Sequence, residues 1–97
     1  MMVGRRRGRR GRPPKPLIIG WTPQVRSFLP FPQGFGEPIQ LEHAEVEALR
    51  LVDLEGLSQE EAGDRMGISR GTVWRLLQSA RRKVAEALTQ GRAIIIV

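Results

Sequence analysis

The chain has 97 residues, which is enough for one small domain with tails. It contains no cysteine and a single histidine, so a disulfide framework, a thiolate zinc site and cysteine catalysis are excluded. Its apolar runs are far shorter than the roughly 20 residues of a membrane helix, and no signal-peptide core follows the first arginines. We therefore expect a soluble cytoplasmic protein that binds no membrane, cofactor or metal.

The net charge of +6 is divided unevenly along the chain. Residues 1–36 hold eight basic residues and no acidic one, residues 37–64 hold nine acids and one arginine, and residues 65–97 hold seven bases and one acid. A basic start, an acidic middle and a basic end favour an oriented molecule that presents its two basic parts to a polyanion.

Residues 1–16 consist mostly of Arg, Gly and Pro, and we expect them to form a disordered basic arm. Within this arm, Arg10-Gly11-Arg12-Pro13 reproduces the core of an AT-hook. Glycine allows the backbone to lie flat in a narrow minor groove, where Arg10 and Arg12 extend along the floor. The alternative is a tail that binds any polyanion, RNA included.

Residues 17–40 combine prolines, which forbid a long helix, with apolar and aromatic side chains such as Trp21, Phe28 and Phe31. We predict a short strand over residues 16–21, followed by an extended segment. Packing of these aromatics on the helical core is the favoured interpretation, because so small a domain needs the extra burial. A surface for a partner is the alternative.

Residues 41–91 carry a helical pattern with recognisable ends. Apolar residues recur at steps of three and four, and the pattern predicts a first helix over Glu42–Leu54 that Gly56 ends. Ser58 and Glu61 form a capping box at the start of a second helix, which Gly67 breaks. The third helix is capped by Ser69 and extends to Leu88 or Thr89, before Gly91.

Residues 92–97 end in three isoleucines and a valine, which predicts a short strand. This strand has no evident cover except residues 17–19, and it could pair with them in the same chain or in a second copy. The second arrangement would make a homodimer.

The second and third helices have the pattern of a helix-turn-helix, in which two short helices cross steeply around a tight turn. Gly67 supplies the positive φ that the turn requires, and Gly63 keeps the second helix thin where the third crosses it. An ordinary helical hairpin with a glycine turn is the plainer alternative. The inward positions are expected to be Ala62, Met66, Ile68, Val73 and Leu76, and the inward stripe of the third helix continues through Leu77, Ala80, Val84, Ala87 and Leu88.

The runs that begin Leu49-Arg50-Leu51-Val52-Asp53, Met66-Gly67-Ile68-Ser69-Arg70 and Ala80-Arg81-Arg82-Lys83-Val84 resemble a prokaryotic family of predicted DNA-binding proteins, domain-of-unknown-function group 134. The helix-turn-helix of that family is similar to region four of bacterial sigma factors. The resemblance extends over nearly the whole chain. It implies an all-α, tri-helical helix-turn-helix domain with an extended basic N-terminal arm, to which the residues themselves add short terminal strands.

A recognition helix enters the major groove with its N-terminal end, so the exposed side chains at the start of the third helix are the best placed to contact base edges. Arg70 or Arg75 could reach guanine, and Trp74 could pack on a thymine methyl or a sugar, although a dimer or core contact is the alternative for Trp74. The hydroxyls of Ser69 and Thr72 suit phosphate binding. Together with the arm residues Arg10 and Arg12, the DNA-binding residues are expected to be Ser69, Arg70, Gly71, Thr72, Trp74, Arg75, Gln78, Arg81 and Arg82.

The sequence therefore predicts sequence-selective binding of double-stranded DNA, in transcriptional regulation at the nucleoid. The alternative is an RNA-binding or non-specific architectural protein that acts through its basic arm. An enzyme is not expected, because His43 has no second histidine or cysteine to complete a site. The acidic surface of the first two helices could also face a basic partner such as part of RNA polymerase.

Overall fold

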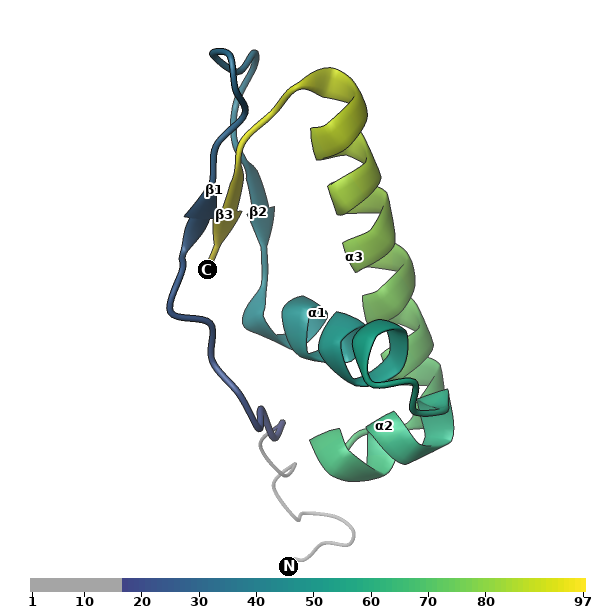
Figure 1. Ribbon diagram of the computed structural model, residues 1–97. Helices are drawn as coiled ribbons and strands as arrows, with labels where there is room; N and C mark the ends of the chain where they lie inside the picture. Colours follow the sequence, from purple (N-terminus) through teal and green to yellow (C-terminus); the bar gives the residue numbers. More distant parts are fainter. Residues whose placement is uncertain (1–16) are drawn as a thin grey trace, which may run out of the picture.

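The computed structural model describes residues 17–97, which form three helical segments and a small sheet (Figure 1). The basic arm over residues 1–16, with Arg10 and Arg12, lies outside the described residues. In chain order the elements are β1 (Ser27–Phe28), β2 (Ile39–Leu41), α1 (His43–Ala48), the π-helix η1 (Leu49–Leu54), α2 (Gln59–Met66), α3 (Arg70–Gln90) and β3 (Ile94–Ile96).

The domain is mostly helical, but the sheet corrects a purely all-α description. Its three strands lie in the order β1-β3-β2, with β3 antiparallel to β1 and parallel to β2. The predicted C-terminal strand is confirmed, since β-branched isoleucines favour the extended backbone. Its predicted partner is wrong: Ile94 pairs with Phe28 and Ile39, and residues 17–19 form no strand. The homodimer was predicted because the C-terminal strand had no evident cover. Since β3 lies between β1 and β2, that reason for a dimer does not hold.

Local signals placed the helices well. Ser58 and Glu61 form the capping box of α2, Ser69 caps α3, and Gly67 and Gly91 end these helices with φ of 69° and 66°. The first helix has the predicted extent, with Glu42 as its N-cap, but its second half has π-helical hydrogen bonding. There the amide of Glu55 donates to the carbonyl of Arg50 at 2.9 Å, five residues earlier.

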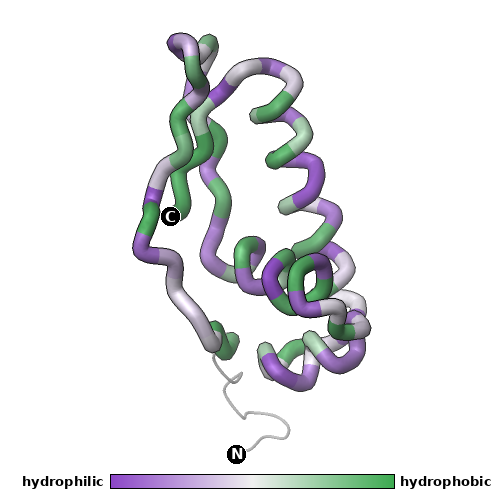
Figure 2. The backbone as a smooth tube through the Cα atoms, in the orientation of Figure 1, coloured by the Kyte–Doolittle hydropathy of each residue, from purple (hydrophilic) through white to green (hydrophobic). Residues whose placement is uncertain are grey.

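The core lies where the three helical segments meet. Figure 2 shows hydrophobic and hydrophilic stretches alternating along α3, as expected for a helix with one buried face. Leu76 and Val84 are half-buried as the helical spacing predicts, but Leu88 and Leu54 are exposed, which corrects their assignment to the buried faces. The central core cluster consists of Ala48, Leu51, Ala62, Met66, Val73 and Leu77, with Ile68 packed against it, and Ala80 of α3 is also fully buried.

Leu17 packs against the core and Ile39 is buried, but the aromatic side chains of β1 and the loop that follows it stay outside the core, which corrects the favoured interpretation for them. Phe31 is 99% exposed, and Phe28, Leu29 and Phe35 also stand mainly in solvent. Residues 27–28 of this segment form the edge strand β1, and β3 separates β1 from β2 (Figure 1).

Candidate nucleic-acid interface

The turn between α2 and α3 is held by glycines with two different functions. Gly67 has a φ of 69°, which favours a residue without Cβ. Gly63 lies against the turn itself: a Cβ at this position would be 2.7 Å from the carbonyl oxygen of Ile68. The amide of Ile68 donates to the carbonyl of Gly63 at 3.0 Å. The close approach expected for Gly63 is therefore present, and it fixes where α3 begins.

The start of α3 presents polar groups to solvent. The Oγ of Ser69 accepts a hydrogen bond from the amide of Thr72 at 3.1 Å and lies 2.9 Å from the Oγ1 of Thr72. The guanidinium of Arg75 lies 3.5 Å from the same Oγ1. The two hydroxyls and the first amides of α3 thus share one exposed end, where the helix dipole favours an anion.

One face of α3 continues from this end. Arg70, Gly71, Arg75 and Gln78 are exposed, and Trp74 is 51% exposed, so Trp74 is not a core residue. Gly71 leaves open space, because a Cβ there would meet only the Oγ of Ser69, at 4.0 Å. The residues predicted for base contact therefore lie together on an accessible surface that combines two guanidinium groups, an indole and an amide.

Two of the next three basic residues of α3 are paired with carboxylates. The guanidinium of Arg81 donates to both oxygens of Asp53, at 3.0 and 2.6 Å. These hydrogen bonds lower the pKa of Asp53 below its usual value and raise the pKa of Arg81. Lys83 donates to Glu45, while Arg82 is exposed and makes no salt bridge with any described residue.

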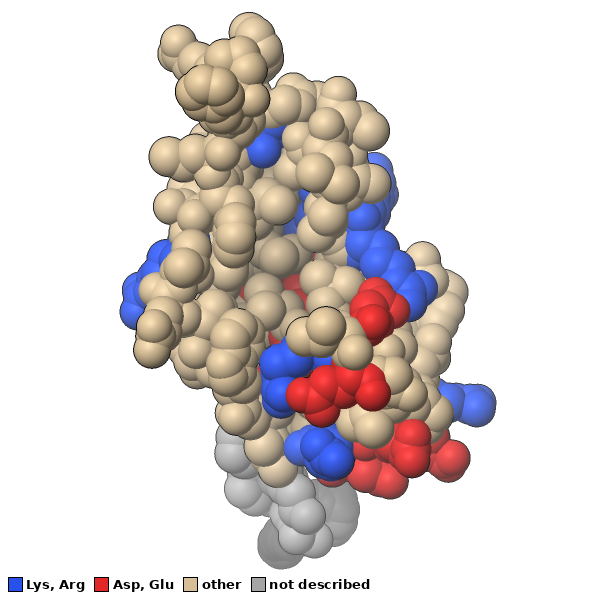
Figure 3. Space-filling view, in the orientation of Figure 1, with Lys and Arg blue, Asp and Glu red and all other residues tan. Residues whose placement is uncertain are grey.

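Basic and acidic side chains are both exposed on the face shown in Figure 3, where several blue groups lie beside red ones and one cluster of acidic side chains lies at the lower end. The exposed acids Glu60, Glu61 and Asp64 all belong to α2. Arg70 and Arg75, on α3, make no salt bridge within residues 17–97.

The residue that follows the arm is anchored beside the turn. The amide of Ile18 donates to the carbonyl of Met66, at the end of α2, at 2.9 Å. The Cδ1 of Ile18 lies 3.5 Å from where a Cβ of Gly67 would stand. The chain therefore enters the described structure beside the end of α2 and the turn that leads to α3.

Two glutamates of α1 are buried and do not belong to the acidic surface that was expected on the first two helices. Glu45 and Glu47 are each 2% exposed. Glu47 accepts hydrogen bonds from the amide of Gly20 at 2.8 Å and from Arg50 at 2.9 Å. Burial works to raise the pKa of Glu47, but the bonds from Arg50 and Gly20 hold it below its usual value. Neither carboxylate is available to a basic partner.

The sequence spacing of these two glutamates indicates their burial and pairing. Glu45 precedes Ala48, Leu49 and Val52 by three, four and seven residues, so it lies on the apolar stripe of its helix. Glu47 lies three residues before Arg50, which is the spacing of a helical ion pair.

Residues 17–97 contain no group of three or more His, Cys, Asp or Glu side chains placed to hold a metal ion. Within the same residues no helix has both the length and the apolar character needed to cross a membrane.

Comparison with known proteins gives a family but no assigned activity. The family described as "Protein of unknown function DUF134" matches residues 5–97. A UPF0251 protein of Thermococcus kodakarensis is 60% identical over 82% of this chain and 74% of its own length. UPF0251 proteins of Pyrococcus furiosus and Thermoanaerobacter are 55% and 47% identical, over 91% and 86% of this chain and 84% and 75% of their own lengths. No solved structure matches the chain.

Proposed function

The chain belongs to the DUF134 family, and we propose that it is a sequence-selective DNA-binding protein that regulates transcription through a helix-turn-helix formed by α2 and α3. The observation that carries this proposal is the exposed N-terminal face of α3. It holds Arg70 and Arg75 outside every described salt bridge, whereas Arg50, Arg81 and Lys83 are held by carboxylates. Unpaired guanidinium groups on one helix end suit a polyanion that offers planar acceptors.

In the proposed complex, the start of α3 lies in the major groove of duplex DNA. Arg70 and Arg75 donate to the O6 and N7 of guanine, and Trp74 packs against a thymine methyl or a sugar. Gly71 allows the helix backbone to approach the groove, because no side chain projects from α3 at this position. Gln78 lies one turn further along the same face.

Phosphates on either side of the groove fix the position of α3. The hydroxyls of Ser69 and Thr72 and the first amides of the helix bind one phosphate, as the positive end of a helix dipole favours. Arg82 lies further along α3, where a phosphate is closer than a base edge. Asp53 competes with DNA for Arg81, so Arg81 contributes less than Arg82.

The arm binds the same duplex in this proposal. An extended chain spans at most about 3.5 Å per residue, so Arg12 reaches no further than roughly 20 Å from the anchored Ile18. That reach extends from the first turn of α3 to the neighbouring minor groove. Arg10 and Arg12 would follow the floor of that groove, where an A·T-rich sequence gives the most negative potential. The acidic side chains of α2 remain free for a basic protein partner such as RNA polymerase.

Selection from random duplex DNA tests the proposal. At about 150 mM salt, purely electrostatic binding is weakened, so the full chain should enrich a defined motif. Arg70→Ala and Arg75→Ala should each lose base preference at specific positions of that motif. Arg26→Ala is the matched control, because it removes the same charge from the segment beside β1 and should leave the motif unchanged.

A chain that lacks residues 1–15 separates the two basic parts. Its affinity should fall while the motif persists. An enriched pool without a motif, lost on removal of the arm and retained by Arg70→Ala and Arg75→Ala, would contradict the proposal and favour an architectural or RNA-binding protein.

A further inference from the structure

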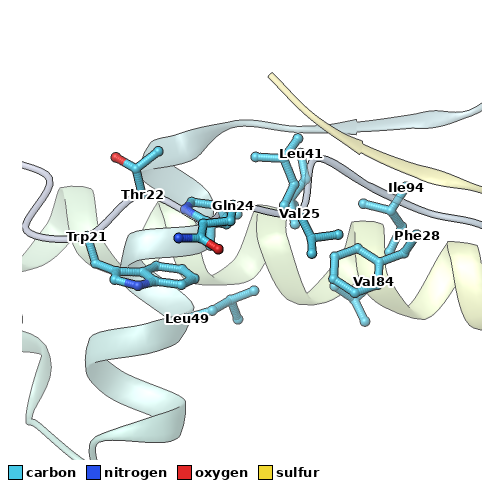
Figure 4. Close-up of a pocket in the computed structure, with 12 residues that line it drawn as sticks. Trp21, Thr22, Gln24, Val25, Phe28, Leu41, Leu49, Val84 and Ile94 are labelled. Carbon is cyan, nitrogen blue, oxygen red and sulfur yellow. The ribbon is translucent and has the colours of Figure 1, made fainter.

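An open apolar cavity lies beside the sheet, with a volume of about 910 Å³. Its walls come from the segment that precedes β1, from β2 and β3, and from α1, η1 and α3. Figure 4 shows the ring of Phe28 beside Val84 and the indole of Trp21 beside Leu49. None of the side chains that line the cavity is charged. An uncharged hollow of this size, open to water, is suited to an apolar occupant.

The same chain exposes a matching apolar projection. The connection between β1 and β2 carries Leu29, Phe31 and Phe35, which are 77%, 99% and 73% exposed. We call these three residues, one leucine and two phenylalanines, the aromatic tip. Residues 27–36 include no Lys, Arg, Asp or Glu, and the loop stands out from the rest of the fold at the top of Figure 1.

The exposed apolar surface has the size of a protein interface. With about 200 Å² for each large apolar side chain, the aromatic tip together with Val25 and Phe28 exposes roughly 700 Å². The largest apolar patch on a monomer is usually about 300–600 Å². A stable complex of standard size buries about 800 Å² on each partner. The aromatic tip and the two cavity residues together therefore expose an apolar area close to one half of a stable interface.

We propose that the chain forms a two-fold homodimer in which the aromatic tip of each copy covers the apolar cavity of the other. A second copy is the occupant we propose because the chain itself supplies both complementary parts, an uncharged projection and an uncharged hollow, which two copies related by a two-fold axis can exchange reciprocally. Both parts are uncharged, so they meet without like-charge repulsion even though the chain has a net charge of +6. Dimer formation uses none of the residues assigned to DNA.

Sedimentation equilibrium of the full chain tests the dimer. Between about 1 and 100 µM, the mass should approach that of two copies. The double substitution Leu29→Ser/Phe31→Ser should raise the dissociation constant at least about a hundredfold, because each dimer loses four buried apolar side chains. These side chains are exposed in the single copy, so the variant should keep its helical circular dichroism.

Leu54→Ser is the matched control. Leu54 is 79% exposed, much as Leu29 is, but it lies on η1 and outside the cavity walls. This variant should dimerise as the unaltered chain does. A loss of dimer in Leu54→Ser equal to that of Leu29→Ser/Phe31→Ser would show non-specific association and overturn the proposal.

Fluorescence gives a second measurement at the cavity itself. The chain has two tryptophans, so Trp74→Phe leaves Trp21 as the single reporter. The emission of Trp21 should shift to longer wavelength when the Trp74→Phe protein is diluted. The same shift should appear without dilution when Leu29→Ser/Phe31→Ser is introduced into that chain. A single-copy mass across the whole concentration range would overturn the proposal, as would a dimer that survives Leu29→Ser/Phe31→Ser. A mass of one copy plus a small apolar molecule in native mass spectrometry would instead assign the cavity to a ligand.

Discussion

The ammonium group of Lys83 in α3 donates a 2.8 Å hydrogen bond to the carboxylate of Glu45 in α1, and the Glu45 side chain is almost completely buried. The amide of Glu42 donates to the same oxygen at 2.8 Å, and the hydroxyl of Ser79 donates to the other oxygen. Each oxygen of this buried charge is therefore satisfied. The cluster joins the start of α1 to the middle of α3.

This cluster predicts acid sensitivity. Burial raises the pKa of Glu45, but the bonds from Lys83, Ser79 and Glu42 outweigh it and hold the pKa below the ordinary value of 4.5. A lowered pKa in the folded state means that the ionised carboxylate stabilises the fold above the ordinary value, and this stability is lost as the pH falls through the folded value. Urea unfolding at several pH values between about 7 and 3 should show the loss.

Glu45→Gln should lower the free energy of unfolding at neutral pH by about 2–3 kcal/mol, because Lys83 loses its partner in a largely buried site. The difference from the unaltered chain should shrink as the pH falls below 4.5. Glu37→Gln, at an exposed position outside the described salt bridges, is the control. A Glu45→Gln deficit that is the same at every pH would contradict the assigned role of the charge.

Two glycines should respond in opposite directions to alanine. Gly63→Ala gains about 1 kcal/mol of helix propensity but forces a Cβ to 2.7 Å from the carbonyl oxygen of Ile68, so we expect a net loss of about 1 kcal/mol or more. Gly71→Ala meets open space and should stabilise the fold by up to about 1 kcal/mol. Thermal unfolding measures the stability of both variants. A Gly63→Ala variant more stable than the unaltered chain would show that the turn at Ile68 can shift to accommodate the Cβ.

The two serine caps separate folding from DNA binding. Ser58→Ala and Ser69→Ala each remove a side chain that accepts an amide hydrogen bond at a helix start, and each should cost about 1 kcal/mol of stability. DNA affinity, measured by fluorescence anisotropy, should fall beyond that effect only for Ser69→Ala. Equal binding by the two variants would exclude Ser69 from the interface.

The pair between Asp53 and Arg81 should limit DNA binding. Asp53→Asn releases Arg81, so the slope of log affinity against log salt should steepen by about 1 for each phosphate that Arg81 gains. The exposed ion pair contributes little to stability, about 1 kcal/mol at most. Glu55→Gln is the control, because Arg50 remains held by Glu47 after that change. An unchanged slope in Asp53→Asn would place Arg81 away from the DNA.

Features set by neighbouring residues could be predicted from the sequence. The capping box of Ser58 and Glu61, the cap at Ser69 and the left-handed glycines 67 and 91 depend on contacts within one helical turn, and each is present. The exposed face of Arg70, Trp74 and Arg75 also follows from helical spacing alone.

Features that join distant parts of the chain were not predictable in the same way. The partners of β3 depend on contacts between Ile94 and both Phe28 and Ile39, which no local pattern specifies. The burial of Glu45 depends on Lys83, 38 residues later. The aromatic side chains of residues 28–35 were expected to pack on the core because so small a domain needs the extra burial, and their exposure follows from the path of the chain around β1, which no local pattern specifies.

The central position of β3 has a consequence for the order of assembly during synthesis. β1 and β2 do not pair with each other, and both wait for residues 94–96 to complete the sheet. The capping signals of α2 and α3 are complete before residues 94–96 are added, but the sheet can close only when β3 is present. Until then Ser27–Phe28 and Ile39–Leu41 have no strand with which to pair.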